Sequence, residues 1–160
     1  VSRLSDAVNV LRPYFYGRNS EFIYCLALDL NDRLLQICKI SDGEADSVVI
    51  NNNKILALVT RTKAKKIILA HNHPAGNIKP SDSDLQATRM LNVLLAGVNA
   101  RLSDHIIFSG DEYFSFYESD LLACFSDDNS HYANEQRRKK RSEGIYMEDE
   151  KPSEETLGEE

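Results

Sequence analysis

The 160-residue sequence is short of cysteine and has no long apolar run. Its three cysteines, Cys25, Cys38 and Cys124, show no CxxC spacing, and we interpret them as reduced thiols of a cytosolic protein. No apolar segment approaches the roughly 18 residues that a membrane-spanning helix needs, so no membrane association is expected. No signal peptide is visible, and the sequence starts at Val1 rather than at a methionine. These absences favour a cytoplasmic domain.

Positive charge is also scarce, with 19 lysines and arginines against 25 acidic residues. Most of the imbalance lies in residues 126–160, which hold 6 basic and 11 acidic residues, whereas residues 1–125 hold 13 and 14. The first 125 residues are therefore nearly neutral and lack the basic signature of a nucleic-acid-binding domain. Residues 126–160 are polar and charge-segregated, which predicts a disordered tail. Their one basic block, residues 137–141, could contact nucleic acid or an acidic partner.

The clearest candidate functional residues, His71 and His73, lie two positions apart just after the apolar run at residues 66–70. The run predicts a buried strand, and α/β folds usually place their chemistry at strand ends. Side chains two positions apart leave an extended backbone on the same side. We therefore interpret the two histidines as the start of a metal site.

The segment after the histidines supplies a third candidate ligand. Two prolines and a glycine within residues 74–80 predict a loop, and Ser81 and Asp84 predict the first turn of a helix. Asp84 could serve the helix start, a metal ion or both, because a helix N-terminus can present Asp84 to the loop while Ser81 caps it. Two imidazoles and one carboxylate would leave a fourth tetrahedral position for water, as in catalytic zinc sites.

The order His71, one residue, His73, seven residues, Ser81, two residues, Asp84 resembles the motif of the JAMM (MPN-type, JAB) metalloproteases. The residues around this motif, and the segment 102–107, are similar to the bacterial RadC family within that superfamily. The resemblance implies that zinc is held by His71, His73 and Asp84.

The same resemblance implies roles for two further side chains. The family places a catalytic glutamate just before a hydrophobic strand upstream of the histidines, and Glu21 matches that place. Glu44, which follows the second strand, is the alternative base. Ser81 would donate a hydrogen bond to the oxyanion of the tetrahedral intermediate. His105 is most simply a satisfied buried group, and a role in orienting a metal ligand is its alternative.

The residue pattern predicts an α/β domain with a mixed β-sheet and helices packed on it, and the JAMM/MPN resemblance implies the same cytidine deaminase-like architecture. Expected helices cover residues 2–12, 48–60, 82–96 and 119–125, and expected strands cover 21–29, 33–40, 66–70, 102–108 and 112–117. We divide the chain into an N-terminal helix and connector at 1–19, a RadC-like JAB/MPN domain at 20–125 and the charged tail at 126–160.

The function that this pattern favours is zinc-dependent hydrolysis of a peptide or isopeptide-type amide, with Zn²⁺ as the cofactor and a peptide or protein as the substrate. Three alternatives stay open: a DNA-associated factor or metal-dependent nuclease, a metal-binding interaction module without turnover, and a structural domain whose histidines and aspartate only cap a loop. The near-neutral charge of residues 1–125 argues against the first. An intact set of candidate ligands argues against the second.

Overall fold

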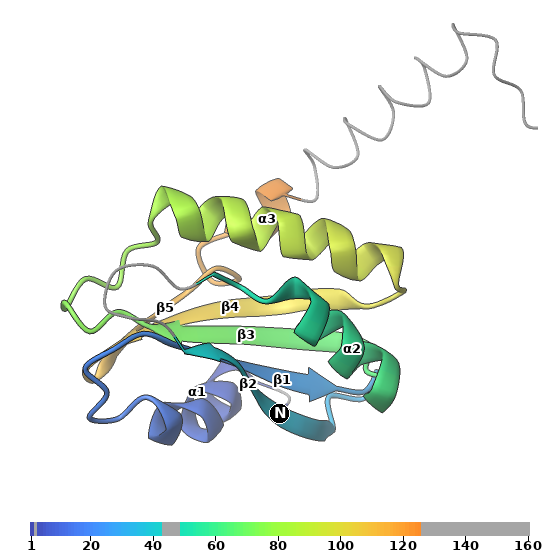
Figure 1. Cartoon of the computed structure of the whole chain (residues 1–160), viewed down its shortest axis with the longest axis horizontal. Coiled ribbons are helices and arrows are strands. Elements are labelled where there is room, and N and C mark those ends of the chain that lie inside the picture. Colours follow the sequence, from blue (N-terminus) through green and yellow to red (C-terminus); the bar gives the residue numbers. More distant parts are fainter. Residues whose placement is uncertain (2, 43–48, 126–160) are drawn as a thin grey trace, which may run out of the picture. The chain divides into compact units, whose positions relative to one another are not determined.

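A five-stranded mixed sheet with the strand order β2-β1-β3-β4-β5 forms the centre of the structure (Figure 1). This computed structural model describes residues 1, 3–42 and 49–125. The strands are β1 (Phe22–Leu28), β2 (Leu34–Asp42), β3 (Lys66–Asn72), β4 (Arg101–Ser109) and β5 (Glu112–Ser115). β3 and β4 run parallel, while all other neighbouring pairs are antiparallel. The predicted mixed-sheet α/β architecture is confirmed.

Each face of the sheet has its own hydrophobic core. On one face α2 (Asn52–Thr62) and α3 (Asp82–Gly97) pack over alternate strand residues such as Ile67 and Leu69. On the other face α1 (Leu4–Leu11) covers the intervening residues, such as Ile68 and Ala70. Because side chains alternate along a strand, the central strand β3 contributes to both cores, and all seven of its residues are buried. Figure 1 shows α3 and α1 on opposite sides of the sheet.

The second helix begins later than the pattern at residues 48–60 predicts. The Asn51 side chain accepts a hydrogen bond from the Lys54 N–H at 3.1 Å and caps the helix. An asparagine at this position stabilises a helix start because its oxygen satisfies one of the open N–H groups. Asn51 therefore lies just before α2, Asn52 and Asn53 form its first two residues, and the helix ends at Thr62, which is followed by Lys63 with a φ of 59°.

The other expected elements appear with shifted ends. α1 is followed by a 3-10 turn at Arg12–Tyr14, β5 ends at Ser115 rather than at residue 117, and a last helical segment covers residues 121–125. Within the described part of the chain, no helix combines the length and apolar character needed to cross a membrane. Glu44 and the predicted tail at 126–160 lie outside the described residues.

Candidate metal centre

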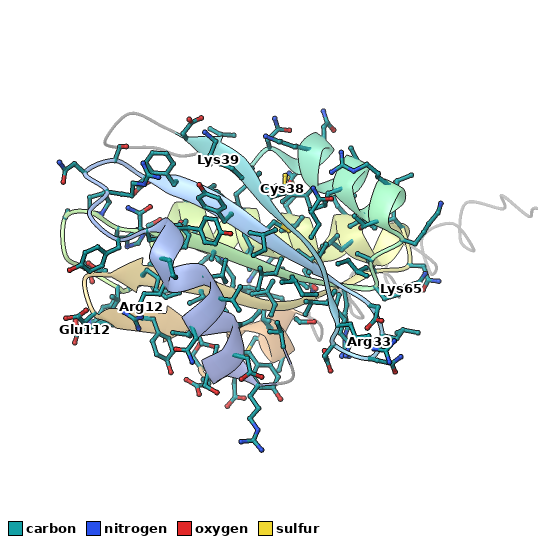
Figure 2. The ribbon with its side chains drawn as sticks, turned by 90° about the horizontal axis from the view of Figure 1, so that it is seen from below. Arg12, Arg33, Cys38, Lys39, Lys65 and Glu112 are labelled. Atoms are coloured by element: carbon teal, nitrogen blue, oxygen red, sulfur yellow. The ribbon has the colours of Figure 1, made fainter. Side chains whose placement is uncertain are left out.

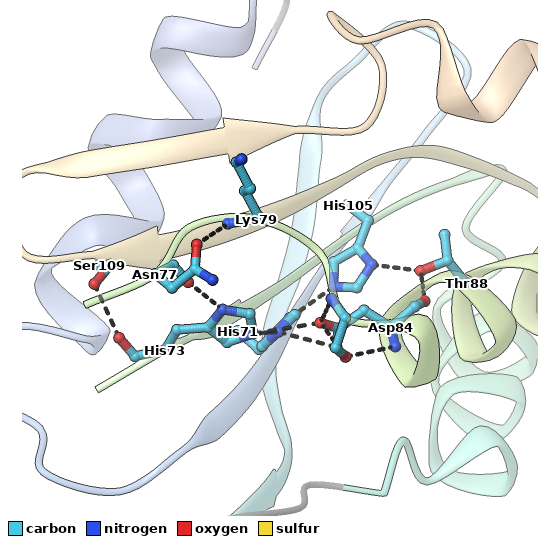
Figure 3. Close-up of polar contacts among 9 residues, drawn as sticks. His71, His73, Asn77, Lys79, Asp84, Thr88, His105 and Ser109 are labelled. Carbon is cyan, nitrogen blue, oxygen red and sulfur yellow. Dashed lines mark hydrogen bonds and ion pairs between the residues drawn. The ribbon is translucent and has the colours of Figure 1, made fainter. Parts of the chain in front are cut away.

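The end of β3 carries both histidines (Figure 3). His71 is buried inside the strand, and His73 follows directly after it. The His73 N–H donates to the Phe108 carbonyl at 2.8 Å, and the Ser109 hydroxyl donates to the His73 carbonyl at 2.9 Å. These bonds continue the pairing of β3 with β4 beyond its last residue. The backbone of His73 is thus held by the neighbouring strand.

Asp84 approaches the histidines from the first turn of α3. Ser81 caps this helix: its hydroxyl oxygen accepts from the Asp84 N–H at 3.1 Å, and its own N–H donates to Asp84 Oδ2 at 2.8 Å. The Ser81 hydroxyl also donates to Asp84 Oδ2 at 2.8 Å. The capping box therefore turns the carboxylate toward the loop, so capping and metal binding are geometrically compatible at Asp84.

The three candidate ligands converge on one point. The Nε2 atoms of His71 and His73 are 2.9 Å apart, and the Asp84 oxygens lie 3.2 Å and 3.3 Å from these nitrogens. Around a tetrahedral zinc ion with bonds of about 2.0–2.1 Å, ligand atoms stand roughly 3.3 Å apart. The observed contacts are close to this value, with Oδ1 facing His71 and Oδ2 facing His73, and one ligand atom from each of the three residues can be chosen so that all lie within 4.8 Å of one another. The cluster could therefore hold a metal ion, and its nitrogen and oxygen ligands suit zinc.

Both histidines use their other ring nitrogen for contacts with the protein. His73 Nδ1 lies 2.5 Å from the Asn77 carbonyl oxygen, and His71 Nδ1 lies 2.8 Å from His105 Nε2. A carbonyl oxygen can only accept, so the Nδ1 of His73 carries its proton. In a neutral ring this leaves the Nε2 lone pair directed into the cluster, which is the form that binds a metal ion.

Charge in the cluster is strongly coupled. Burial opposes ionisation of Asp84, but the contacts of its carboxylate with the His71 and His73 rings outweigh it and hold the pKa of Asp84 far below its usual range. The hydrogen bond with Asp84 raises the pKa of His73 above its usual value, against the effect of burial. In the metal-free protein this aspartate and histidine form an ion pair at pH values below the raised pKa of His73. A metal ion would take the place of the proton.

The strand register brings Glu21 to the same end of the sheet. β1 and β3 are antiparallel with Ile23 opposite His71, so a residue two positions before Ile23 falls beside His73. Glu21 lines a small pocket together with His71 and Asp84, and its charge contributes to the raised pKa of His73. The structure thus places the predicted base at the predicted metal cluster, although 50 residues separate it from His71 in the sequence.

Asn72, to which the sequence pattern assigns no role, holds the segment that carries Glu21. Its Oδ1 accepts from the Phe22 N–H at 2.8 Å, and its Nδ2 donates to the Ser20 carbonyl at 2.9 Å. Both neighbours of Glu21 are therefore tied to one side chain that is only 4% exposed. The sequence feature that could have identified Asn72 is its position, as a polar residue between two histidines at the end of an otherwise apolar strand.

Two more polar side chains lie behind His71. His105, on β4, stacks on Phe116 with ring centroids 4.7 Å apart, and its Nδ1 lies 2.7 Å from the Thr88 hydroxyl. Burial lowers the pKa of His105 well below its usual value, so the ring is neutral. The contact between His105 and His71 agrees with the orienting alternative for His105. Nothing in the sequence distinguished the Thr88 hydroxyl from an ordinary buried helix position.

Comparison with known proteins gives consistent matches. The family model described as the RadC-like JAB domain matches residues 1–121. A UPF0758 protein of Coxiella burnetii is 36% identical over 117 residues, which cover 73% of this chain and 52% of the relative. A UPF0758 protein of Chlorobaculum parvum is 34% identical over 126 residues, covering 76% of this chain and 57% of the relative. The chain thus spans about half the length of these curated relatives.

Proposed function

This chain belongs to the RadC-like JAB domain family, and from that premise we propose that it is a zinc-dependent hydrolase of peptide or isopeptide-type amides. The observation that carries the proposal is the convergence of two imidazole nitrogens and one carboxylate within 3.3 Å of one another. Glu21 in the pocket beside them supports hydrolysis rather than metal storage, because a carboxylate near the metal and not among its ligands is available as a base.

His71, His73 and Asp84 would hold the metal ion through two Nε2 atoms and a carboxylate oxygen. When bound, zinc supplies a Lewis acid that makes a hydroxide nucleophile available near neutral pH. Glu21 accepts the proton of the attacking water and later delivers it to the leaving amide nitrogen. This assignment needs Glu21 charged and close to the cluster, and its place before β1 meets the second condition.

Ser81 would stabilise the oxyanion that forms on the substrate carbonyl. Its hydroxyl now donates to Asp84 Oδ2 at 2.8 Å, so the hydroxyl must rotate to reach a substrate. Rotation is feasible because Ser81 is exposed, and the capping box keeps the Ser81 N–H bonded to Asp84 meanwhile. A bound metal ion would draw on the same carboxylate and so favour the release of this hydroxyl.

The test combines metal analysis with a substrate screen. The purified chain should contain about one zinc ion, by the three-ligand rule. It should cleave at least one member of a library of fluorogenic peptides and lysine-linked isopeptides. Glu21→Gln should keep its zinc and lose roughly a hundredfold or more in turnover, the scale of general-base catalysis. Glu112→Gln is the matched control, because Glu112 is an exposed glutamate on the edge strand β5, two strands away from β3 and outside the pocket that Glu21 lines (Figure 2).

Outcomes of this experiment separate the proposal from its alternatives. Zinc binding without turnover on any peptide or isopeptide would favour the metal-binding interaction module. Cleavage of single- or double-stranded DNA in a parallel screen, lost in Glu21→Gln, would favour a nuclease. A protein that binds no zinc, and retains the same melting temperature after chelation, would contradict the metal site itself.

A further inference from the structure

A continuous line of hydrogen bonds joins two of the candidate metal ligands through side chains that are not ligands (Figure 3). It starts at His71 Nδ1, passes to His105 Nε2 at 2.8 Å, and continues from His105 Nδ1 to the Thr88 hydroxyl at 2.7 Å. The Thr88 hydroxyl then donates to the carbonyl of Asp84, one turn earlier in α3. The line connects β3, β4 and α3, and its two ends are the backbone of one ligand and the ring of another.

The chemistry of these groups fixes the position of every proton along the line. The Asp84 carbonyl can only accept, so the single hydroxyl proton of Thr88 is used there. Thr88 Oγ1 must then accept from His105, which places the His105 proton on Nδ1. His105 is 1% exposed, and because such burial disfavours a charged ring it carries one proton, so its Nε2 accepts from His71. The proton of His71 is therefore on Nδ1, and its Nε2, which also lies 3.2 Å from Asp84 Oδ1, can accept from His73 Nε2 at 2.9 Å.

We infer that His105 and Thr88 are positioning residues that hold the proton of His71 on Nδ1 and so keep its Nε2 free for the metal ion. The inference rests on the proposed function, since it assigns His71 as a ligand. The hydrogen-bond directions themselves do not depend on any metal. Thr88 sets the tautomer of His71 without contacting it, because the tautomer of the buried His105 depends on Thr88 and determines that of His71.

The inference predicts a reversal of proton positions when the hydroxyl is removed. In Thr88→Val the buried Nδ1–H of His105 has no acceptor, which is unfavourable. The other tautomer of His105, with its proton on Nε2, escapes this problem and donates to His71 Nδ1. The proton of His71 then moves to Nε2 and points into the cluster. A metal ion would have to displace that proton, which lowers its affinity.

The first readout is the tautomer of His71 in the metal-free protein, from long-range ¹⁵N–¹H correlation spectra of ¹⁵N-histidine-labelled protein. The wild type should show the Nδ1–H form, Thr88→Val mainly the Nε2–H form, and Thr88→Ser the wild-type form. If Thr88→Val does not fold, Thr88→Ala removes the same hydroxyl without adding a methyl group. Retention of the Nδ1–H form in the folded variant that lacks the hydroxyl would overturn the inference.

The second readout is zinc affinity, measured by competition with a chromophoric chelator. Thr88→Val should bind zinc on the order of 10–100-fold more weakly than the wild type, the usual range for removing such a supporting group. Thr88→Ser should bind nearly as the wild type does. The matched control is Thr60→Val, because the exposed Thr60 also donates to a carbonyl one turn earlier, that of Leu56, but lies on α2.

The two readouts distinguish this inference from the proposed function. A wild type that binds no zinc would contradict the proposed function, while the tautomer of His71 would still decide the role of Thr88. If Thr88→Val binds zinc as tightly as a zinc-binding wild type does, the inference is overturned and the proposed function is not. A purely structural role for Thr88 would lower the melting temperature of Thr88→Val without moving the His71 proton.

Discussion

Removing the Asn72 side chain should release the segment that carries the proposed base from the strand that carries the candidate metal ligands His71 and His73. Asn72→Ala deletes the hydrogen bonds to the Phe22 N–H at 2.8 Å and to the Ser20 carbonyl at 2.9 Å. It leaves the backbone of β3 and its pairing with β4 in place. We therefore expect zinc binding to survive and the position of Glu21 to be lost.

The size of the effect follows from the two lost bonds. Each intramolecular hydrogen bond contributes about 1 kcal/mol net to stability, and more where a partner is left buried and unpaired. The two partners, on Ser20 and Phe22, are only partly buried, so water can satisfy them in part. The free energy of unfolding should fall by about 2–3 kcal/mol. For a domain of this size that corresponds to a drop of roughly 10 °C in melting temperature.

The assay is a thermal melt of the metal-free protein, combined with zinc stoichiometry and turnover of the zinc-loaded protein. Asn31→Ala is the matched control, because Asn31 is exposed in the turn between β1 and β2 and its side chain makes none of these bonds. Turnover of Asn72→Ala should fall toward that of Glu21→Gln while zinc remains near one equivalent. A melting temperature within about 2 °C of the wild type, a shift below 1 kcal/mol, would refute the reasoning.

Three further predictions concern the cluster and the tail. Asp84→Asn should lose zinc and turnover together, because it removes a charged ligand; metal analysis beside turnover checks this, and full zinc occupancy would contradict it. In the metal-free protein the Asp84–His73 ion pair should stabilise the fold between about pH 4 and 6.5, the unfolded-state pKa values of the two groups. Because the pKa of Asp84 is lowered in the folded protein, the stabilisation from its charge is lost only when pH falls well below 4. Because the pKa of His73 is raised in the folded protein, the stabilisation from its charge is lost when pH rises through that raised pKa. Urea unfolding at pH 5.5 and 8.5 should show this loss without zinc and not with it; equal stability at both pH values would contradict the pairing. Deletion of residues 126–160 should leave the melting temperature nearly unchanged, and a large drop would show that these residues pack on the domain.

The sheet and its helices follow largely from local pattern, and their ends do not. Apolar runs at 66–70 and 102–108 predict strands because a buried strand needs a continuous apolar sequence. The sequence pattern predicts too early a start for α2 because apolar spacing continues upstream of the cap, and only the hydrogen bond from Lys54 to Asn51 shows where the helix begins. Helix periodicity alone carries no information about which of several asparagines caps.

The sequence by itself identified the candidate metal ligands, because they lie within one strand–loop–helix segment. His71 and His73 share a side of an extended chain, and Asp84 stands in the first turn of the helix that follows, so local geometry almost suffices to bring them together. Glu21 came from the family resemblance, since no spacing rule relates it to the histidines.

Only the tertiary structure decided what surrounds the ligands. The antiparallel register of β1 and β3 brings Glu21 to the cluster, and it is set by which side chains can be buried together, which no single strand specifies. Tertiary structure also decides the contact of Asn72 with the Phe22 N–H of β1, and the contact between His105 on β4 and Thr88 on α3. Hydrogen bonds between distant segments need positions fixed by packing, so their partners become visible only once the chain is folded.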